Sequence, residues 1–325
     1  MRYILLILIS LAAALLLPSA TNAQRVAANT LKVSPVRTDI EVALGMRKVV
    51  QITATNLDSK PVTVTPVAND FIAGDEKGTP ALILDETDRA PVHSLKRFLS
   101  PLQTVTIPAK ESVTVPVVVT VPADAQAGGY YGAVRFMPSS PDGGGQVNVS
   151  PSVASLILLR VPGDALEQLK LTHFSIFNDN ASGFYFQTPE ALQVYARFEN
   201  IGNVQVAPQG KVVVSKKWSD AVWEHDFNIE NPKGMILPDS ARRWDIPLKD
   251  LDGIGYYTVT ATLVYGEKNS TVEVSHSFLV APLWLVLILI VVPLLLIASA
   301  IVITIFVTRR RKRRRSRMVR RRFGR

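Results

Sequence analysis

The chain has 325 residues, and its formal net charge of +9 comes from one end. Twelve of the 36 Lys and Arg residues lie in Arg309–Arg325 and one more is Arg2, so 23 stand against 27 Asp and Glu residues in the rest, a net charge of about −4. The basic composition therefore does not indicate nucleic-acid binding. Because the chain has no cysteine, disulfides, a thiol nucleophile and thiolate metal ligands are excluded.

Residues 1–23 have the layout of a cleavable secretory signal peptide. Arg2 supplies the positive start, an apolar core covers Ile4–Leu17, and a proline and small residues precede Gln24. We therefore expect residues 24–281 to lie outside the cell. A chain that folds there without disulfides favours a bacterial source, and we take a bacterium with a single membrane as the setting.

Apolar residues occupy every second position in several segments of this outer region. The clearest are Val113–Val121, Leu192–Phe198 and Tyr257–Tyr265. This period is typical of half-buried antiparallel strands, and helical periodicity is missing between the signal segment and the apolar run near the C-terminus. The sequence therefore predicts an all-β fold, with two tandem immunoglobulin-like β-sandwich domains followed by one transmembrane α-helix.

Three blocks of the first half recur in the same order in the second half. They are a strand that ends in Asn before a turn, a proline-led turn into a strand, and a strand that opens with paired tyrosines. The copies are Ile52–Val67, Thr106–Val117 and Gly128–Phe136, then Ala196–Val214, Ile236–Pro247 and Gly253–Tyr265. This self-similarity indicates two copies of one unit. The Pro-Gly turn at Pro162–Gly163 separates the predicted domains, 24–163 and 164–281.

Residues 71–100 form an insertion without a clean period. A long irregular loop in a compact domain is commonly functional or partly disordered, and we expect one of these. Its acidic clusters, Asp75–Glu76 and Asp85–Asp88, lack the oxygen spacing of a calcium loop. We interpret them as solvated loop charge.

A run of apolar residues without charge, Leu283–Val307, precedes the basic C-terminus. At 1.5 Å per residue this run covers more than the roughly 30 Å hydrocarbon core of a bilayer. Clusters of Lys and Arg stay on the cytoplasmic side. We therefore predict a transmembrane helix at 282–308, a basic cytoplasmic tail at 309–325, and a single-pass type I topology in the cell membrane.

Catalytic and metal-binding patterns are missing from the sequence. The four histidines are scattered, and no H-E-x-x-H or G-x-S-x-G segment occurs. The glycine run Gly143–Gly145 lacks the Lys-Ser/Thr of a phosphate loop. We therefore predict that the protein is not an enzyme and has no catalytic residue, no metal site and no cofactor.

Each half opens one strand with two adjacent tyrosines. Tyr130 and Tyr256 fall where a Greek-key sandwich places a tyrosine corner, whose hydroxyl bonds back to the backbone. Tyr131 points to the opposite face of its strand, which it shares with Arg135. An aromatic ring beside a cation suits a glycan that carries carboxylates. Tyr131 and Arg135 are therefore the candidate ligand-binding residues, with inward packing of Tyr131 as the alternative.

Four blocks carry a family resemblance: VSPVRTDIEVALGMRKVVQITATNLDSKPVTV, GGYYGAVRF, ENIGNVQVAPQGKVVV and ILPDSARRW. With the signal segment, the apolar span and the basic tail, they resemble the WxL-interacting protein family of Gram-positive bacteria. The resemblance implies a peptidoglycan-binding first domain and a host-protein-binding second domain. The chain is not itself a WxL protein, since none of its four tryptophans begins a Trp-x-Leu motif.

These observations predict a membrane-anchored cell-surface binding protein. Its first domain would contact peptidoglycan or another wall glycan, and its second domain a surface or host protein, with no nucleic-acid partner. The alternative is a membrane-tethered chaperone-like or surface-assembly protein that binds polypeptide strands at a sheet edge. A third class, a degenerate hydrolase or a transporter accessory subunit, stays open.

Overall fold

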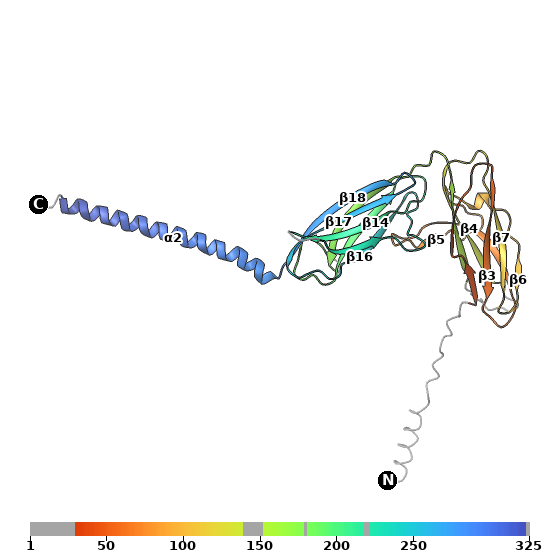
Figure 1. Cartoon of the computed structure of the whole chain (residues 1–325), viewed down its shortest axis with the longest axis horizontal. Coiled ribbons are helices and arrows are strands. Elements are labelled where there is room, and N and C mark those ends of the chain that lie inside the picture. Colours follow the sequence, from red (N-terminus) through yellow and green to blue (C-terminus); the bar gives the residue numbers. More distant parts are fainter. Residues whose placement is uncertain (1–29, 139–151, 179–180, 218–220, 323–325) are drawn as a thin grey trace, which may run out of the picture.

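The computed structural model describes residues 30–138, 152–178, 181–217 and 221–322, the last twelve of these by their backbone. The predicted signal peptide, 1–23, lies outside these residues. Two β-sandwiches follow one another along the chain, and a long helix leaves the second at the end away from the first (Figure 1). The predicted all-β class, with two tandem immunoglobulin-like sandwiches and a C-terminal helix, is confirmed.

The first sandwich is built from β1 (Leu31–Ser34), β2 (Arg37–Glu41), β3 (Arg47–Asn56), β4 (Val62–Ala73), β5 (Pro80–Leu82), the 3₁₀ turn η1 (Lys96–Phe98), β6 (Val105–Ile107), β7 (Ser112–Thr120), β8 (Gly128–Pro138) and β9 (Val153–Val161). One sheet has the order β1-β3-β7. The other has the order β2-β9-β8-β4-β5, with β6 also paired to β4. Within it, β2 runs parallel to β9.

The second sandwich is built from β10 (Leu169–Asn178), β11 (Ala181–Ser182), β12 (Tyr185–Phe186), β13 (Leu192–Asn200), β14 (Gln209–Lys216), β15 (Ala221–Phe227), β16 (Ser240–Pro247), β17 (Gly255–Tyr265) and β18 (Ser270–Val280). Its sheets have the orders β11-β10-β13-β16 and β12-β18-β17-β14-β15. The helix α2 (Leu283–Arg322) follows.

Each sandwich buries its own apolar side chains between its two sheets. The predicted strands Val113–Val121, Leu192–Phe198 and Tyr257–Tyr265 are confirmed as β7, β13 and β17, and their alternate residues face the core. The largest buried side chains are Ile52, Leu95, Ile107, Phe136, Ile157 and Leu159 in the first core, and Ile176, Leu192, Phe198, Phe227, Tyr257 and Phe278 in the second.

Two buried asparagines give the internal repeat its physical basis. Asn56, at the end of β3, donates a hydrogen bond from Nδ2 to the Ile107 carbonyl oxygen at 3.2 Å. Asn200, at the end of β13, donates in the same way to the Ile236 carbonyl oxygen at 2.9 Å. Each amide also bonds the turn that follows its strand. The same residue therefore ties the same two blocks together in both sandwiches.

A tyrosine corner occurs in each sandwich, one of them at an unexpected residue. The Tyr130 hydroxyl donates to the Gln126 carbonyl oxygen at 2.8 Å, as predicted. In the second sandwich Tyr257 takes this role, with its hydroxyl 3.0 Å from the Gly253 carbonyl oxygen. The prediction of Tyr256 is therefore wrong. In both sandwiches the hydroxyl bonds the carbonyl oxygen of the residue four positions earlier in the sequence, which is Gln126 for Tyr130 and Gly253 for Tyr257.

The insertion at 71–100 is built into the first sandwich. It begins with a hairpin of β4 and β5, whose tip is residues 74–79. The buried Asp70 carboxylate accepts hydrogen bonds from the backbone nitrogens of Ala90 and Lys96, both at 2.9 Å. One carboxylate thus gathers distant parts of the insertion.

The helix α2 begins three residues after β18 ends. Its segment Leu283–Arg310 is long and apolar enough to cross a membrane, which agrees with the predicted span at 282–308. The direction of crossing, and with it the type I topology, stays a prediction.

Candidate functional site

The two sandwiches meet along an apolar seam, formed by Phe71, Tyr131 and Leu158 of the first and Met235 and Leu237 of the second. The rings of Phe71 and Tyr131 lie edge to face with centroids 6.0 Å apart. Burial of this cluster joins the sandwiches more firmly than a bare linker would.

Tyr131, a predicted ligand-binding residue, lies inside this seam. Its side chain is 3% exposed, and its hydroxyl donates to Gln205 Oε1 of the second sandwich at 2.8 Å. Burial raises the pKa of the Tyr131 phenol far above its ordinary value. Arg135 is half-buried, and its Nε donates to Asn69 Oδ1 at 3.2 Å. Tyr131 therefore has a structural role in the seam, and a ligand site at Tyr131 and Arg135 stays a prediction.

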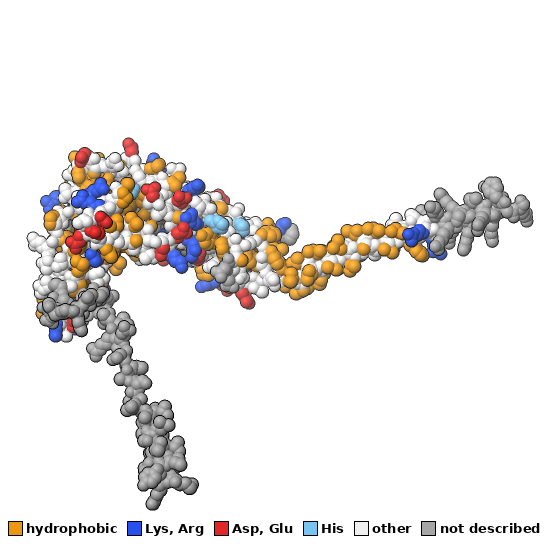
Figure 2. Space-filling view, turned by 180° about the vertical axis from the view of Figure 1, so that it is seen from behind, with side chains coloured by type: hydrophobic (Ala, Val, Ile, Leu, Met, Phe, Trp, Pro, Cys, Tyr) orange, Lys and Arg blue, Asp and Glu red, His pale blue; other side chains and the backbone are white. Residues whose placement is uncertain are grey.

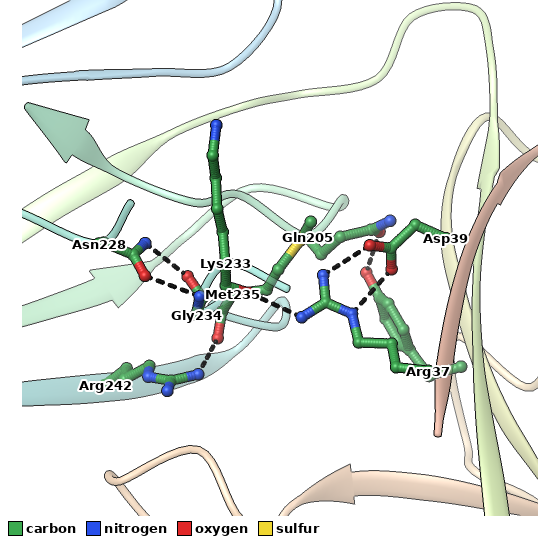
Figure 3. A network of polar contacts seen from close by, with 9 residues as sticks. Arg37, Asp39, Gln205, Asn228, Lys233, Gly234, Met235 and Arg242 are labelled. Carbon is green, nitrogen blue, oxygen red and sulfur yellow. Dashed lines mark hydrogen bonds and ion pairs between the residues drawn. The ribbon is translucent and has the colours of Figure 1, made fainter. Parts of the chain in front are cut away.

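Two arginines form the polar side of the seam (Figure 3). Arg37 donates from Nη1 to the Lys233 carbonyl oxygen at 2.7 Å and pairs with the Asp39 carboxylate at 2.7 Å. Arg242 donates from Nη1 to the Met235 carbonyl oxygen at 3.1 Å. Burial, then the charge of Arg37, lowers the pKa of Arg242. The two guanidinium groups line a cavity of about 110 Å³. Both donate hydrogen bonds to the chain's own backbone, and Arg37 also pairs with Asp39.

The hairpin tip, residues 74–79, extends the seam onto β13 and β16. The Glu76 carboxylate accepts a hydrogen bond from Arg197 Nη2 at 2.7 Å, and its backbone oxygen accepts one from the Arg243 nitrogen at 2.6 Å. Gly78 has φ +90°, and a Cβ there would lie 2.3 Å from the Arg242 guanidinium. The interpretation of Glu76 as solvated charge is therefore wrong. Its partners, Arg197 and Arg243, stand more than 100 residues away in the sequence, so no local pattern revealed them.

Glu76 makes the stability of the contact between the hairpin tip and the second sandwich dependent on pH. Hydrogen bonding and the charge of Arg197 lower the pKa of Glu76 from its ordinary value of 4.5. A carboxylate with a lowered folded-state pKa stabilises the fold above its ordinary pKa, and this is lost as the pH falls through the lowered value. The side chains of Glu76 and Arg197 are 43% and 29% exposed, so solvent screens this ion pair. We therefore expect it to add at most about 1 kcal/mol to the free energy of unfolding.

We therefore expect Glu76→Gln to lower the free energy of unfolding at pH 7 and to match the parent near pH 2. Denaturant unfolding of the full chain in detergent micelles at both pH values measures this difference. Glu86→Gln, which removes an exposed carboxylate of the same insertion outside the contact with the second sandwich, is the control and should show no such pH dependence. A deficit of Glu76→Gln that persists unchanged at pH 2 would contradict the assignment.

An open groove of about 400 Å³ lies along the outer edge of β7. The chain bridges β7 at Leu99, opposite Val119, and then turns away at Pro101. The space left between Pro101–Val105 and Val113–Pro116 is this β7 groove. Its apolar lining comes from Leu102, Val105, Val113 and Val115. The groove therefore leaves room for one more strand beside β7, at the side of the sandwich.

The backbone of β7 directs hydrogen-bonding groups into this groove. Ser100 donates its N–H to the Val118 carbonyl oxygen at 3.0 Å, from the side of β7 opposite to β3. Since alternate residues of a strand bond to the same side, Ser112 and Thr114 direct their N–H and C=O groups outward as well. Pro116 occupies the next outward position, where its missing N–H costs no bond to β3.

The edges of β2, β15 and β16 are less suited to an added strand. On β2 the alternate residues Arg37, Asp39 and Glu41 are charged, and β15 carries Glu224 and Asp226 in the same arrangement. Charged side chains along an edge discourage pairing. The edge of β16 is met by the hairpin tip. The β7 groove is therefore the candidate site.

Within the residues that the structure describes, no group of three or more His, Asp or Glu side chains could hold a metal ion. His93 contacts the seam through its carbonyl oxygen, which accepts a hydrogen bond from the Tyr131 nitrogen at 2.8 Å. The predicted lack of enzymatic activity, catalytic residues and cofactors stays a prediction.

No protein-family model and no curated protein matches the chain. Among solved structures, the class 5 fimbriae chaperone CfaA is 13% identical, with 78% of this chain and 100% of that chain covered and a TM-score of 0.39. A chain from the complex of Salmonella enterica SafA pilin with the SafB chaperone is 11% identical, with 76% and 94% covered and a TM-score of 0.33. These likenesses concern the layout of strands and say nothing of what this chain binds. The resemblance to the WxL-interacting family stays a prediction.

Proposed function

We propose that the chain is a membrane-anchored surface protein whose first sandwich holds an extended segment of a partner protein as an added strand on β7. The observation that carries this proposal is the β7 groove, where the outward N–H and C=O of Thr114 adjoin an apolar floor. In strand addition, main-chain hydrogen bonds supply affinity and pockets for alternate side chains supply selectivity. The proposal follows the alternative drawn from the sequence, polypeptide binding at a sheet edge.

The groove also indicates the chemistry of the segment. Four residues of β7 line it, a length of roughly 13 Å at 3.3 Å per residue. Every second side chain of an added strand would meet the apolar floor, and the others would lie beside Ser112 and Thr114 on the outer face. Since the residues that line the groove carry no charge, we expect an uncharged segment that alternates apolar and small polar residues.

A wall glycan has weaker support. The residues predicted to bind it are Tyr131 and Arg135, and Tyr131 is occupied by the seam between the sandwiches. Peptidoglycan binding by the first domain, and a host protein for the second, stay predictions from the family resemblance. The β7 groove offers backbone groups, which a polypeptide complements along its length.

The substitution Thr114→Pro tests the proposal. It removes the outward N–H and leaves the bonds of the neighbouring residues to β3 intact, as Pro116 already does two positions on. We expect at least tenfold weaker binding, about 1.4 kcal/mol, of a synthetic seven-residue peptide that alternates Val and Thr. Fluorescence anisotropy of the labelled peptide with the full chain in micelles measures it.

Thr114→Val is the matched control, because it changes the same side chain and keeps the N–H. It should bind the peptide as tightly as the parent, and both variants should melt within a few degrees of it. The proposal fails if the parent does not bind the peptide, or if Thr114→Pro binds as tightly as Thr114→Val.

A further inference from the structure

The end of the second sandwich that adjoins α2 is fixed close to the start of the helix. Two residues, Ala281 and Pro282, separate β18 from α2, and fully extended they span about 7 Å. The Ala281 nitrogen donates to the Phe186 carbonyl oxygen at 2.9 Å, so this connection is itself held to the sandwich. The headgroup layer on each side of a bilayer is roughly 5–8 Å thick. If α2 spans the membrane, this end of the sandwich lies at headgroup level.

Apolar side chains are exposed at this same end. Phe184 is 55% exposed, Ile254 is 50% exposed and Tyr256 is 38% exposed. The rings of Phe184 and Tyr256 contact each other with centroids 6.3 Å apart, and Tyr256 pairs with Leu279, the penultimate residue of β18. Trp284, in the first turn of α2, continues the apolar surface. Figure 2 shows hydrophobic side chains on the second sandwich next to the start of the helix.

These exposed side chains do not pack in the core of the second sandwich. Tyr257 takes the inward position and the tyrosine corner, so Tyr256 is directed outward by the alternation of the strand. The Lys217 ammonium lies 5.7 Å from the centre of the Tyr256 ring. Aromatic rings with a nearby cation are the composition that proteins place at a membrane interface.

We infer that Phe184, Ile254 and Tyr256, with Lys217, form a membrane-contacting foot that rests among the lipid headgroups of the bilayer crossed by α2. The occupant of this surface is the bilayer because the helix starts three residues from the sandwich and brings lipid to it. The rings and Ile254 enter the headgroup layer, and Lys217 meets anionic lipid. The foot limits the tilt of the second sandwich and so sets the direction in which the β7 groove faces.

The cysteine-free chain allows a direct test with single labels. Ile254→Cys carries an environment-sensitive fluorophore in the full chain, reconstituted in nanodiscs that contain phosphatidylglycerol and a lipid with a shallow spin-label quencher. Ile229→Cys is the matched control. Ile229 is 61% exposed and follows the end of β15, on the side of the second sandwich away from α2. Ile297→Cys, within α2, reports the span itself.

We expect the lipid quencher to reduce the emission at Ile254 at least twofold more than at Ile229. The added pair Phe184→Ser and Tyr256→Ser should remove most of that difference, with unchanged quenching at Ile297. Equal quenching at Ile254 and Ile229, with Ile297 quenched, overturns the foot and leaves the span intact. Protection of Ile254 from soluble iodide without lipid quenching also overturns it, because a second copy would then cover the surface. Neither result touches the β7 groove.

Discussion

Tyr131→Ala should lower the free energy of unfolding by about 3–5 kcal/mol, the range measured when large buried aromatic residues are truncated to alanine. The ring is 3% exposed between Phe71 and the second sandwich, and its removal also leaves Gln205 without its hydroxyl partner. We expect the midpoint of thermal unfolding to fall by roughly 10 °C. The two sandwiches should then unfold in separate transitions, which differential scanning calorimetry of the full chain resolves.

Arg135→Ala is the informative control, because it removes the other residue of the predicted ligand pair from the same face of β8. The hydrogen bond from its Nε to Asn69 predicts a loss of about 1 kcal/mol. Tyr131→Phe, which keeps the ring, should behave similarly. A Tyr131→Ala chain that melts like Arg135→Ala would show that Tyr131 does not hold the seam.

Asn200→Ala should destabilise the second sandwich by about 3 kcal/mol. Asn200 is fully buried, and its amide bonds the Val204 and Ile236 carbonyl oxygens and the Gly202 nitrogen at 2.8, 2.9 and 2.9 Å. Each buried polar group left without a partner costs roughly 1–3 kcal/mol, and the costs do not add fully. Chemical denaturation followed by circular dichroism measures the loss.

The matched control is Asn178→Ala, which removes one exposed amide bond to Glu190 in the same sandwich. It should change the free energy of unfolding by less than 1 kcal/mol. Asn56→Ala should reproduce the large effect in the first sandwich, because Asn56 has the same place in the repeat. An Asn200→Ala loss no greater than that of Asn178→Ala would refute this account of the repeat.

The strands and the repeat could be predicted because their causes are local. The alternation in Val113–Val121 gives the face of each residue in β7 directly. The Asn at the end of β3 and β13 has to stand next to its turn, so the repeat shows in the sequence. The predicted tyrosine of the second corner is one residue too early. The choice between Tyr256 and Tyr257 depends on which hydroxyl reaches the Gly253 carbonyl oxygen, four residues before Tyr257.

The seam and the hairpin tip could not be predicted from local patterns. The sequence places Tyr131 on the face opposite to Tyr130, and that face could meet solvent, a ligand or another domain with the same alternation. Which one it meets depends on Met235 and Leu237, about 100 residues on. Glu76 meets Arg197 in the same long-range way.

One feature of the sequence indicates the open edge at the β7 groove. A proline inside a strand favours an edge position, and Pro116 stands inside the alternating segment Val113–Val121. What the sequence does not show is that the chain leaves this edge at Pro101 after a single bridge at Leu99. That turn creates the open space, and it depends on the path of the whole insertion.

Residue-level amide hydrogen exchange of β7 tests the proposed strand addition most directly. In the free chain, the N–H of Thr114 points into the groove and should exchange rapidly, while those of Val113 and Val115 are bonded to β3 and protected. With saturating Val-Thr peptide, we predict that the Thr114 amide becomes protected by at least tenfold. An unchanged exchange rate at Thr114, or new protection at β15 in its place, would contradict the account.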